Sequence, residues 1–443
     1  MDNSNAFVEP DSATEHGRKW CILLFVAIIL QFLFLSIYCY RYHFSSAMFE
    51  SDAASEVLLA ENIYENGGHV FSKDWCYSTE IRVLHNQLVM VPLFSFTNNY
   101  NLVYTAGFMI WTALILLSVY FCIRSYSGTI RQSLLATLFF LIPYGAYRRY
   151  SPFSMHFFNG YYSFFLFNTF LFLGLLQQYK KSERNGRTYG ILTVLSVLSF
   201  GLGCCGVRYA LLVFGPLLCV ELIQFLWEAK DKFSLSSVRT RCYLIPLIIC
   251  FGIGYITYSK HILVTFGGTR NYASTLKFAF FSQALSQFQQ VISGFLEGLG
   301  FSWDGGKAFS ILGIVNLIFL VFTGLSVFLF TRLIRKCKNL NLNLRNYVLF
   351  AGAQVTVNVV ALTFFGVDDY GAIVRYVWIG CICCLPLLAL VEQEKLRRII
   401  CLGGGYCYVC WGIFSFGLRP IRRENWPSHM EKMYLINIIE VLR

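Results

Sequence analysis

Residues 20–40 read WCILLFVAIILQFLFLSIYCY, a stretch without a single charged side chain. A helix of about 20 apolar residues is long enough to cross the hydrocarbon core of a bilayer. The stretch is too long for the apolar core of a signal peptide, and no small-residue cleavage site follows it. We therefore expect a retained transmembrane helix, and with it a membrane protein.

The composition of the whole chain agrees with this expectation. Of the 443 residues, 56% are hydrophobic and 14% are charged, whereas a soluble domain carries about 25% charged residues. A net charge of +12 suggests nucleic acid in a soluble protein, but here the positive-inside rule explains it, so we expect no nucleic-acid partner. The 16 cysteines lie mostly in apolar runs, away from the His or acidic neighbours that a zinc cluster needs.

Recurring apolar runs predict an all-α polytopic membrane protein with about 11 transmembrane helices. The predicted spans are 20–40, 101–123, 133–147, 160–178, 189–205, 209–227, 242–258, 309–331, 347–365, 376–391 and 399–417. Basic clusters alternate onto one side of this topology, which predicts a multi-pass plasma-membrane protein with a cytoplasmic N-terminus and an extracytoplasmic C-terminus. We expect residues 1–417 to form one transmembrane domain and 418–443 to begin an outer-face segment that continues in longer relatives.

Two long loops, 43–86 and 259–308, are expected on the outer side. The first loop carries seven of the 24 acids of the chain, namely Glu50, Asp52, Glu56, Glu61, Glu65, Asp74 and Glu80. It is expected to form two short surface helices, the first ended by Asn66-Gly67-Gly68 and the second within residues 72–88. The Gln- and Phe-rich run of the second loop predicts a re-entrant or surface helix.

Asp52 has two interpretations. As the N-cap of the first surface helix it would stabilise that helix by about 1 kcal/mol. As a partly desolvated carboxylate at the membrane surface it would take a proton from an incoming hydroxyl group, as a general base does. Glu56 is expected on the same helical face as Asp52.

A second polar group lies later in the same loop and consists of Asp74, Glu80, Arg82 and His85. These residues are either solvated loop charges that pair with one another, which contributes little to stability, or part of a site. Their crowding beside aromatic residues at a membrane favours the site.

The chain resembles the GT-C superfamily of polytopic glycosyltransferases, which includes the protein O-mannosyltransferases and the lipid A aminoarabinose transferase. The residues that carry the resemblance are SDAASE (51–56) and SKDWCYSTEIR (72–82), together with a long first outer loop and the many spans. The chain also resembles uncharacterised GT-C-like membrane proteins of Gram-positive bacteria. The Asp-Asp or Asp-Glu pair of some members is absent, because Ala53 follows Asp52.

The resemblance implies an enzyme of the cell envelope that takes a hexosyl or pentosyl group from a polyprenyl-phosphate carrier, with an inverting mechanism. The acceptor would be a glycan, a lipid or a protein, and membrane lipid would surround the enzyme. Asp52 would be the base and Glu56 a further acid of the site. Asp74 and Glu80 would assist it or bind a divalent metal ion, which is the one candidate cofactor.

A lipid-phosphate donor needs cations in the outer headgroup layer, and arginine binds phosphate with two parallel hydrogen bonds. The predicted outer ends supply arginines beside tyrosines, namely Arg148, Arg149, Arg208 with Tyr209, and Arg375 with Tyr376. These residues either bind the donor or anchor the helices among headgroups. Asp369 is a candidate partner for Arg208 or Arg375, because an arginine at the edge of hydrocarbon needs one.

Two other function classes are weighed against the glycosyltransferase. A transporter or flippase places ionisable groups near the middle of the bilayer, but Glu221 is the one acid well inside a predicted span. A polymerase of lipid-linked glycans would share the outer arginines but does not predict an acidic first loop. The sequence therefore favours a glycosyltransferase.

Overall fold

The computed structural model describes residues 15–42, 51–68, 70–73, 75, 77, 81–127, 129–141, 162–183, 186–231, 238–266, 277–278, 281–299, 311–366 and 374–390. Within these ranges the regular secondary structure is helical, apart from an antiparallel pairing of β1 (Lys277–Phe278) with β2 (Phe365–Gly366), and turns and bends join the elements. The predicted all-α class is therefore confirmed for the part of the chain that the structure describes.

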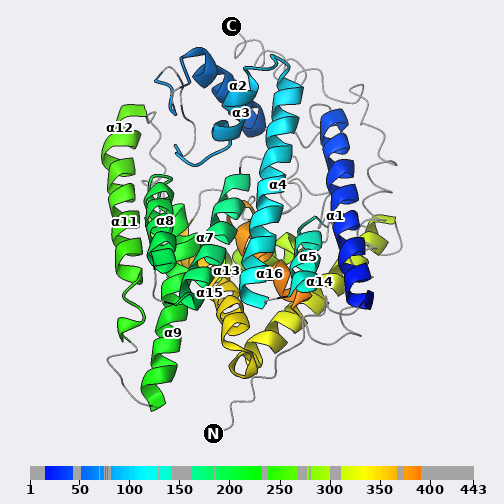
Figure 1. Cartoon of the computed structure of the whole chain (residues 1–443), viewed down its shortest axis with the longest axis vertical. Coiled ribbons are helices and arrows are strands. Elements are labelled where there is room, and N and C mark those ends of the chain that lie inside the picture. Colours follow the sequence, from blue (N-terminus) through cyan, green and yellow to red (C-terminus); the bar gives the residue numbers. More distant parts are fainter. Residues whose placement is uncertain are drawn as a thin grey trace.

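The helices form one bundle (Figure 1). They are α1 (Glu15–Tyr42), α2 (Ser51–Glu65), α3 (Gln87–Leu93), α4 (Tyr100–Ser127), α5 (Ile130–Phe140), α7 (Ser163–Lys181), α8 (Gly186–Gly203), η1 (Ala210–Phe214), α9 (Gly215–Asp231), α11 (Leu244–Thr257), η2 (Tyr258–Ile262), α12 (Leu263–Phe266), α13 (Phe281–Gly298), α14 (Ile311–Arg335), η4 (Cys337–Asn339), α15 (Leu342–Phe364) and α16 (Val374–Ala389). The long helices run lengthwise, with α1 and α11 at opposite edges and α2 and α3 across one end.

Among the described residues, five helical stretches are long and apolar enough to cross a membrane. They are Gly17–Arg41, Tyr100–Ser127, Ala210–Glu228, Leu244–Phe266 and Leu342–Phe364. They include the first predicted span, so residues 20–40 do form one long helix. The count of 11 spans stays a prediction, and the last predicted span, 399–417, lies outside the described residues.

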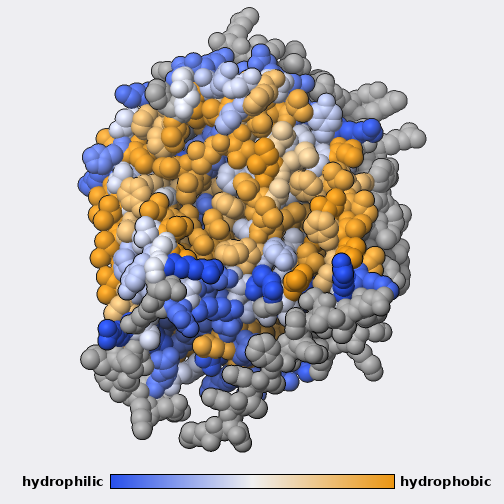
Figure 2. All heavy atoms as spheres, in the orientation of Figure 1, coloured by the Kyte–Doolittle hydropathy of each residue, from blue (hydrophilic) through white to orange (hydrophobic). Residues whose placement is uncertain are grey.

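Large apolar side chains cover the outside of the bundle. Leu23 and Phe25 of α1 are 59% and 56% exposed, and Ile249 of α11 is 54% exposed. Figure 2 shows the resulting apolar band between two more polar ends. Monomeric soluble proteins rarely expose apolar patches of this extent, and the pattern indicates a membrane-embedded protein.

The second predicted loop, 259–308, begins too early. The helix of α11 continues without interruption through η2 and α12 to Phe266, so the predicted end of that span at residue 258 is wrong. The helix expected inside the loop is present as α13. It packs against α15 and α16 and buries Val291 and Phe295, so it belongs to the bundle.

Basic residues of several predicted clusters lie at one end of the bundle, here called the basic end (Figure 1). They include Arg124, Lys180, Lys181 and Arg335 in the last turns of α4, α7 and α14, Arg345 in the first turn of α15, and Arg241 before α11. The predicted cluster at 395–398 lies outside the described residues. Glu221, which is 5% exposed, forms ion pairs there with Lys180 and, at 3.3 Å, with the Arg241 Nε atom. That this end faces the cytoplasm stays a prediction.

A proline inside one membrane-spanning helix explains a contact between two helices. Pro216 has no backbone N–H, so it leaves the Leu212 carbonyl without its usual helical donor. The chain responds with the wide turn η1, in which the Gly215 N–H donates to the Ala210 carbonyl five residues earlier. The side-chain amide of Gln354 on α15, which is fully buried, donates to the Leu212 carbonyl at 3.0 Å. Gln354 thus satisfies a buried backbone group.

We expect Gln354→Leu to destabilise the protein by about 1–3 kcal/mol, because it leaves the Leu212 carbonyl buried without a donor. Adding Pro216→Ala should recover part of this loss, because an alanine at that position supplies the missing N–H. The measurement is the thermal unfolding midpoint of the detergent-solubilised protein for both single variants and the double variant. If the stability change of the double variant equals the sum of the two single changes, Gln354 does not replace the N–H donor that Pro216 lacks.

Candidate functional site

The first long loop, described from Ser51 onward, is anchored over the end of the bundle opposite the basic end, here called the loop end (Figure 1). Its helix α2 buries Val57 and Ile63. The helix ends where Gly67 and Gly68 adopt φ values of 88° and 75°, and the Gly68 N–H donates to the Ile63 carbonyl at 2.8 Å. This is a glycine C-cap of the Schellman type. The predicted helix and its end are confirmed, and its place on the membrane surface stays a prediction.

The second predicted helix, within residues 72–88, is wrong. The described residues from Val70 to Asn86 form bends and turns, and α3 begins only at Gln87. The Ser72 N–H donates to the Tyr77 hydroxyl at 3.0 Å, and the Leu84 N–H donates to the Sγ atom of Cys205, beyond α8, at 3.3 Å. Side-chain acceptors, one of them distant in sequence, replace helical hydrogen bonds in this segment.

Two contacts fix the loop to the membrane-spanning helices. The Tyr100 hydroxyl, at the start of α4, donates to the Glu61 carboxylate at 2.7 Å. The ring of Phe71 lies 5.0 Å from that of Phe266, at the end of α12. The loop is thus held at both its acidic helix and its irregular segment.

Gln87 joins two of the predicted site residues. Its side-chain amide donates to Glu56 Oε2 at 2.6 Å, and its backbone N–H donates to His85 Nδ1 at 3.1 Å. Because Nδ1 accepts a hydrogen bond, the neutral imidazole carries its proton on Nε2. Glu56 and His85 therefore belong to one hydrogen-bonded unit, and His85 is held as a single tautomer.

The protonation of this unit follows from its surroundings. Burial lowers the pKa of His85 to about 3, and the charge of Arg82 acts in the same direction. Burial also raises the pKa of Tyr77, as does the nearby Glu56 carboxylate. At neutral pH His85 is an uncharged donor and Tyr77 is an intact phenol.

Arg82 and Arg208 stack on the same two aromatic rings. The Cζ atom of Arg82, a buried residue, lies 5.9 Å from the ring centroid of Tyr162 and 5.3 Å from that of Phe165. The Cζ atom of Arg208 lies 5.3 Å and 5.2 Å from these rings. Such cation–π contacts are each worth about 0.5–2 kcal/mol, most when desolvated. Two arginines far apart in sequence thus share one aromatic support.

Tyr209 and Tyr376, which the sequence analysis chose as site residues, lie beside these rings and arginines. The hydroxyl of Tyr209, which is fully buried, accepts a hydrogen bond from Asn168 Nδ2 at 2.9 Å, and its ring lies 5.1 Å from that of Phe165. The ring centroid of Tyr376 lies 5.9 Å from the Cζ atom of Arg208. We call the following residues the arginine cluster: Arg82, Arg208, Tyr162, Phe165, Tyr209 and Tyr376.

Other predicted site residues are placed only in part. Asp52 and Arg375 have helical backbones in the first turns of α2 and α16, without described side chains. Five more lie outside the described residues, namely Asp74, Glu80, Arg148, Arg149 and Asp369. In the described ranges no group of three or more His, Cys, Asp or Glu residues is arranged to hold a metal ion. A metal site that includes Asp74 or Glu80 stays a prediction.

The sequence analysis missed Gln87, Tyr162 and Phe165. Gln87 carries no charge, and its role depends on the fold of the loop rather than on a motif. The two rings belong to the run YYSFFLF (161–167) at the start of a span. An aromatic belt at a membrane interface gives the same pattern, so this run did not identify a site.

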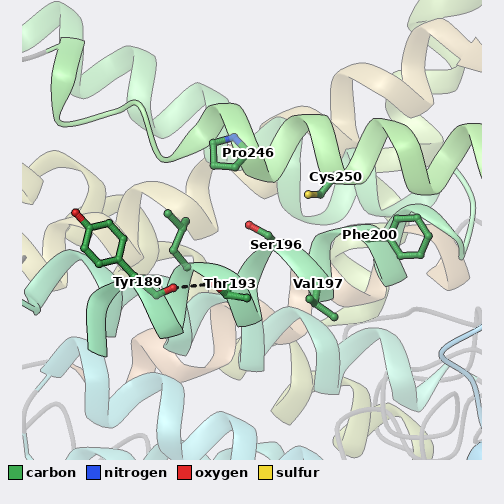
Figure 3. Close-up of a pocket in the computed structure, with 8 residues that line it drawn as sticks. Tyr189, Thr193, Ser196, Val197, Phe200, Pro246 and Cys250 are labelled. Atoms are coloured by element: carbon green, nitrogen blue, oxygen red, sulfur yellow. Dashed lines mark hydrogen bonds between the residues drawn. The ribbon is translucent and has the colours of Figure 1, made fainter. Parts of the chain in front are cut away.

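An apolar groove lies elsewhere, between α8 and α11 (Figure 3). It encloses about 440 Å³ and is lined by Tyr189, Leu192, Thr193, Ser196, Val197, Phe200, Pro246 and Cys250. None of these is a predicted site residue, and none carries a formal charge at neutral pH. The groove therefore offers no cation to a phosphate and no carboxylate or imidazole for acid–base chemistry.

No protein-family model matches the chain, and neither a curated protein nor a solved structure matches it. The resemblance to the GT-C superfamily therefore rests on the sequence motifs alone.

We expect the protein to lose stability as the pH falls from 7 to 5. The folded-state pKa of His85 is about 3 and the unfolded value is about 6.5. Between these values the unfolded chain binds a proton that the folded chain does not, so the free energy of unfolding falls with pH, by about 2 kcal/mol at pH 5. Thermal unfolding of the solubilised protein at both pH values measures the loss.

The His85→Gln variant should show a smaller loss, because Gln does not titrate and its side-chain oxygen can accept the Gln87 N–H. His261 is exposed, and His261→Gln is the matched control that should behave as the native protein. An equal pH effect in all three proteins would mean that His85 is protonated without cost.

Proposed function

We propose that the chain is a GT-C-type integral membrane glycosyltransferase that moves a sugar from a polyprenyl-phosphate carrier to an acceptor at the loop end. The observation that carries the proposal is the arginine cluster. Arg82 comes from the acidic loop and Arg208 from the start of a membrane-spanning helix, and both lie on the rings of Tyr162 and Phe165. An anionic lipid headgroup fits such a pair of cations.

The arginine cluster suits the phosphate of a lipid-linked donor. Each guanidinium can offer parallel N–H donors to phosphate oxygens, while the ring that it contacts limits its orientation. The rings also shield the cations from water, which strengthens their attraction for an anion. Arg375 is the second residue of α16 and directly precedes Tyr376, which suits it to the same headgroup.

The acidic helix α2 would supply the base. The Asp52 carboxylate takes the proton of the acceptor hydroxyl, whose oxygen forms a bond to the anomeric carbon of the sugar. The bond from that carbon to the phosphate oxygen breaks, and polyprenyl phosphate leaves with the bonding electrons. A direct displacement of this kind inverts the configuration of the anomeric carbon.

The unit of Glu56, Gln87 and His85 would position the loop and the acceptor. Glu56 is hydrogen-bonded to Gln87, and Glu56 lies one helical turn after Asp52 on the same helix. Gln87 therefore ties the helix that carries the base to the segment that carries Arg82 and His85. Neutral His85, with its proton on Nε2, can donate a hydrogen bond without adding charge.

The rival classes find less support. A transporter or flippase needs ionisable groups along a path through the bilayer. Glu221 instead lies at the basic end, in ion pairs with Lys180 and Arg241. A polymerase of lipid-linked glycans would use the same arginines but gives no role to the acids of α2.

We expect Asp52→Asn to abolish sugar transfer while expression and membrane insertion stay normal. Asp52 is the second residue of α2 and Asn has nearly the same shape as Asp, so the change mainly removes the ionisable carboxylate. The assay follows consumption of a polyprenyl-phosphate sugar and release of polyprenyl phosphate by membranes containing the protein. Glu65→Gln, at an exposed position of the same helix, is the control and should keep its activity. Near-native turnover of Asp52→Asn would mean that Asp52 is not the base.

We expect Arg208→Ala to raise the KM for the donor by at least about tenfold, since a charge-assisted phosphate contact is worth about 1.5–3 kcal/mol. Arg208→Lys should keep part of the binding through its charge. The control is Lys336→Ala, which removes an exposed cation beyond the end of α14. If Arg208→Ala and Lys336→Ala change the KM for the donor by the same small factor, Arg208 is a membrane anchor and does not bind the donor.

A further inference from the structure

A second pair of cations shares an aromatic ring at the basic end, far from the loop end. The Nζ atom of Lys338 lies 5.6 Å from the ring centroid of Trp227, and the Cζ atom of Arg345 lies 5.8 Å from it. Trp227 lies at the end of one candidate span, Ala210–Glu228, and Arg345 lies in the first turn of another, Leu342–Phe364. The three residues therefore lie where a membrane helix meets the headgroup layer.

No acid neutralises this pair in the described part of the chain. Glu228, the neighbour of Trp227, pairs with Arg241 at 2.9 Å, and among the described residues neither Lys338 nor Arg345 forms an ion pair. The Arg345 Nε atom is buried and has no acceptor within the same ranges. A buried guanidinium nitrogen without an acceptor costs free energy, which an anion at this place would recover.

The surrounding helices hold the pair in place. The Asn341 side chain caps α15 by accepting the Leu344 N–H at 2.8 Å. On either side of Arg345, Asn343 accepts a hydrogen bond from Gln177 of α7 at 2.6 Å, and Asn346 accepts one from Gln224 of α9 at 2.5 Å. Arg345 thus projects from a helical turn that is tied to two neighbours. Because the backbone that carries Arg345 is already ordered by these contacts, ligand binding does not have to order it.

We propose that Trp227, Lys338 and Arg345 form a binding site for the headgroup phosphate of an anionic membrane lipid in the leaflet at the basic end. The guanidinium offers two donors to phosphate oxygens, the ammonium adds a compact charge, and the indole lies at the depth where tryptophan favours the interface. Basic pockets between membrane helices are known to bind anionic headgroups. This site does not depend on the proposed transferase activity.

The test uses the full-length protein, purified in detergent and freed of lipid. Native mass spectrometry measures the binding of single molecules of phosphatidylglycerol and, for comparison, phosphatidylcholine. The test variant is Lys338→Ala with Arg345→Ala. The control is Arg335→Ala with Lys336→Ala. It removes the same amount of charge from two exposed residues that directly precede η4.

The native protein should prefer phosphatidylglycerol. The test variant should bind its first phosphatidylglycerol about tenfold more weakly or worse, since each cation near a headgroup is worth about fivefold, whereas the control should lose less than about threefold. An equal loss in both double variants would overturn the site in favour of general surface charge. Unchanged binding in the test variant would also overturn it.

A phosphate competition and a single-residue variant cover the two remaining outcomes. Inorganic phosphate is added at the same concentration, and if it displaces the lipid fully, the site takes free phosphate and the assignment to lipid is wrong. If the test variant does not elute as a single folded species, Lys338→Ala alone serves instead, because Lys338 is exposed on a short turn. That variant should weaken phosphatidylglycerol binding about fivefold, and no weakening would refute the proposal.

Discussion

A bilayer offers a backbone no water to bind, and this constraint shapes the whole bundle. Polar side chains between the helices serve backbone groups: Gln354 donates to the Leu212 carbonyl, and the hydroxyls of Ser133, Thr137 and Ser199 donate to carbonyls four residues earlier in the chain. Groups used in this way are not free for chemistry. Charge is therefore concentrated at the two ends, where water and headgroups can solvate it.

Both ends hold cations on aromatic rings, and the basic end adds a cluster of ion pairs. At the basic end, Glu221 compensates Lys180 and Arg241 within one buried group, which resembles a structural ion cluster. At the loop end, Arg82 and Arg208 are gathered on aromatic rings. Aromatic faces attract cations while leaving their formal charge in place, which is compatible with the phosphate contact proposed for these two arginines. The acids of α2 add the opposite charge at the same end.

Short sequence motifs correctly predicted the features that depend only on residues close together in the chain. The end of α2 follows from Gly67 and Gly68, because few other residues adopt their φ values, and the first span follows from uninterrupted hydrophobicity. The segment before α3 was predicted wrongly because its hydrogen bonds run to distant atoms, such as the Sγ atom of Cys205. Arg82 and Arg208 were chosen individually, each from its position beside a membrane. That they meet on Tyr162 and Phe165 depends on packing between helices, which no local pattern encodes.

The wide turn η1 has a geometric consequence for the loop end. A π turn holds one more residue than an α turn, and each extra residue rotates everything before it by about 100° around the helix axis relative to everything after it. Arg208 and Tyr209 precede η1, whereas Glu221 follows it. The face that Arg208 presents thus depends on Pro216, which lies about two helical turns further along the chain. In an unbroken α-helix of the same sequence, Arg208 would point to a different neighbour while Glu221 kept its ion pairs.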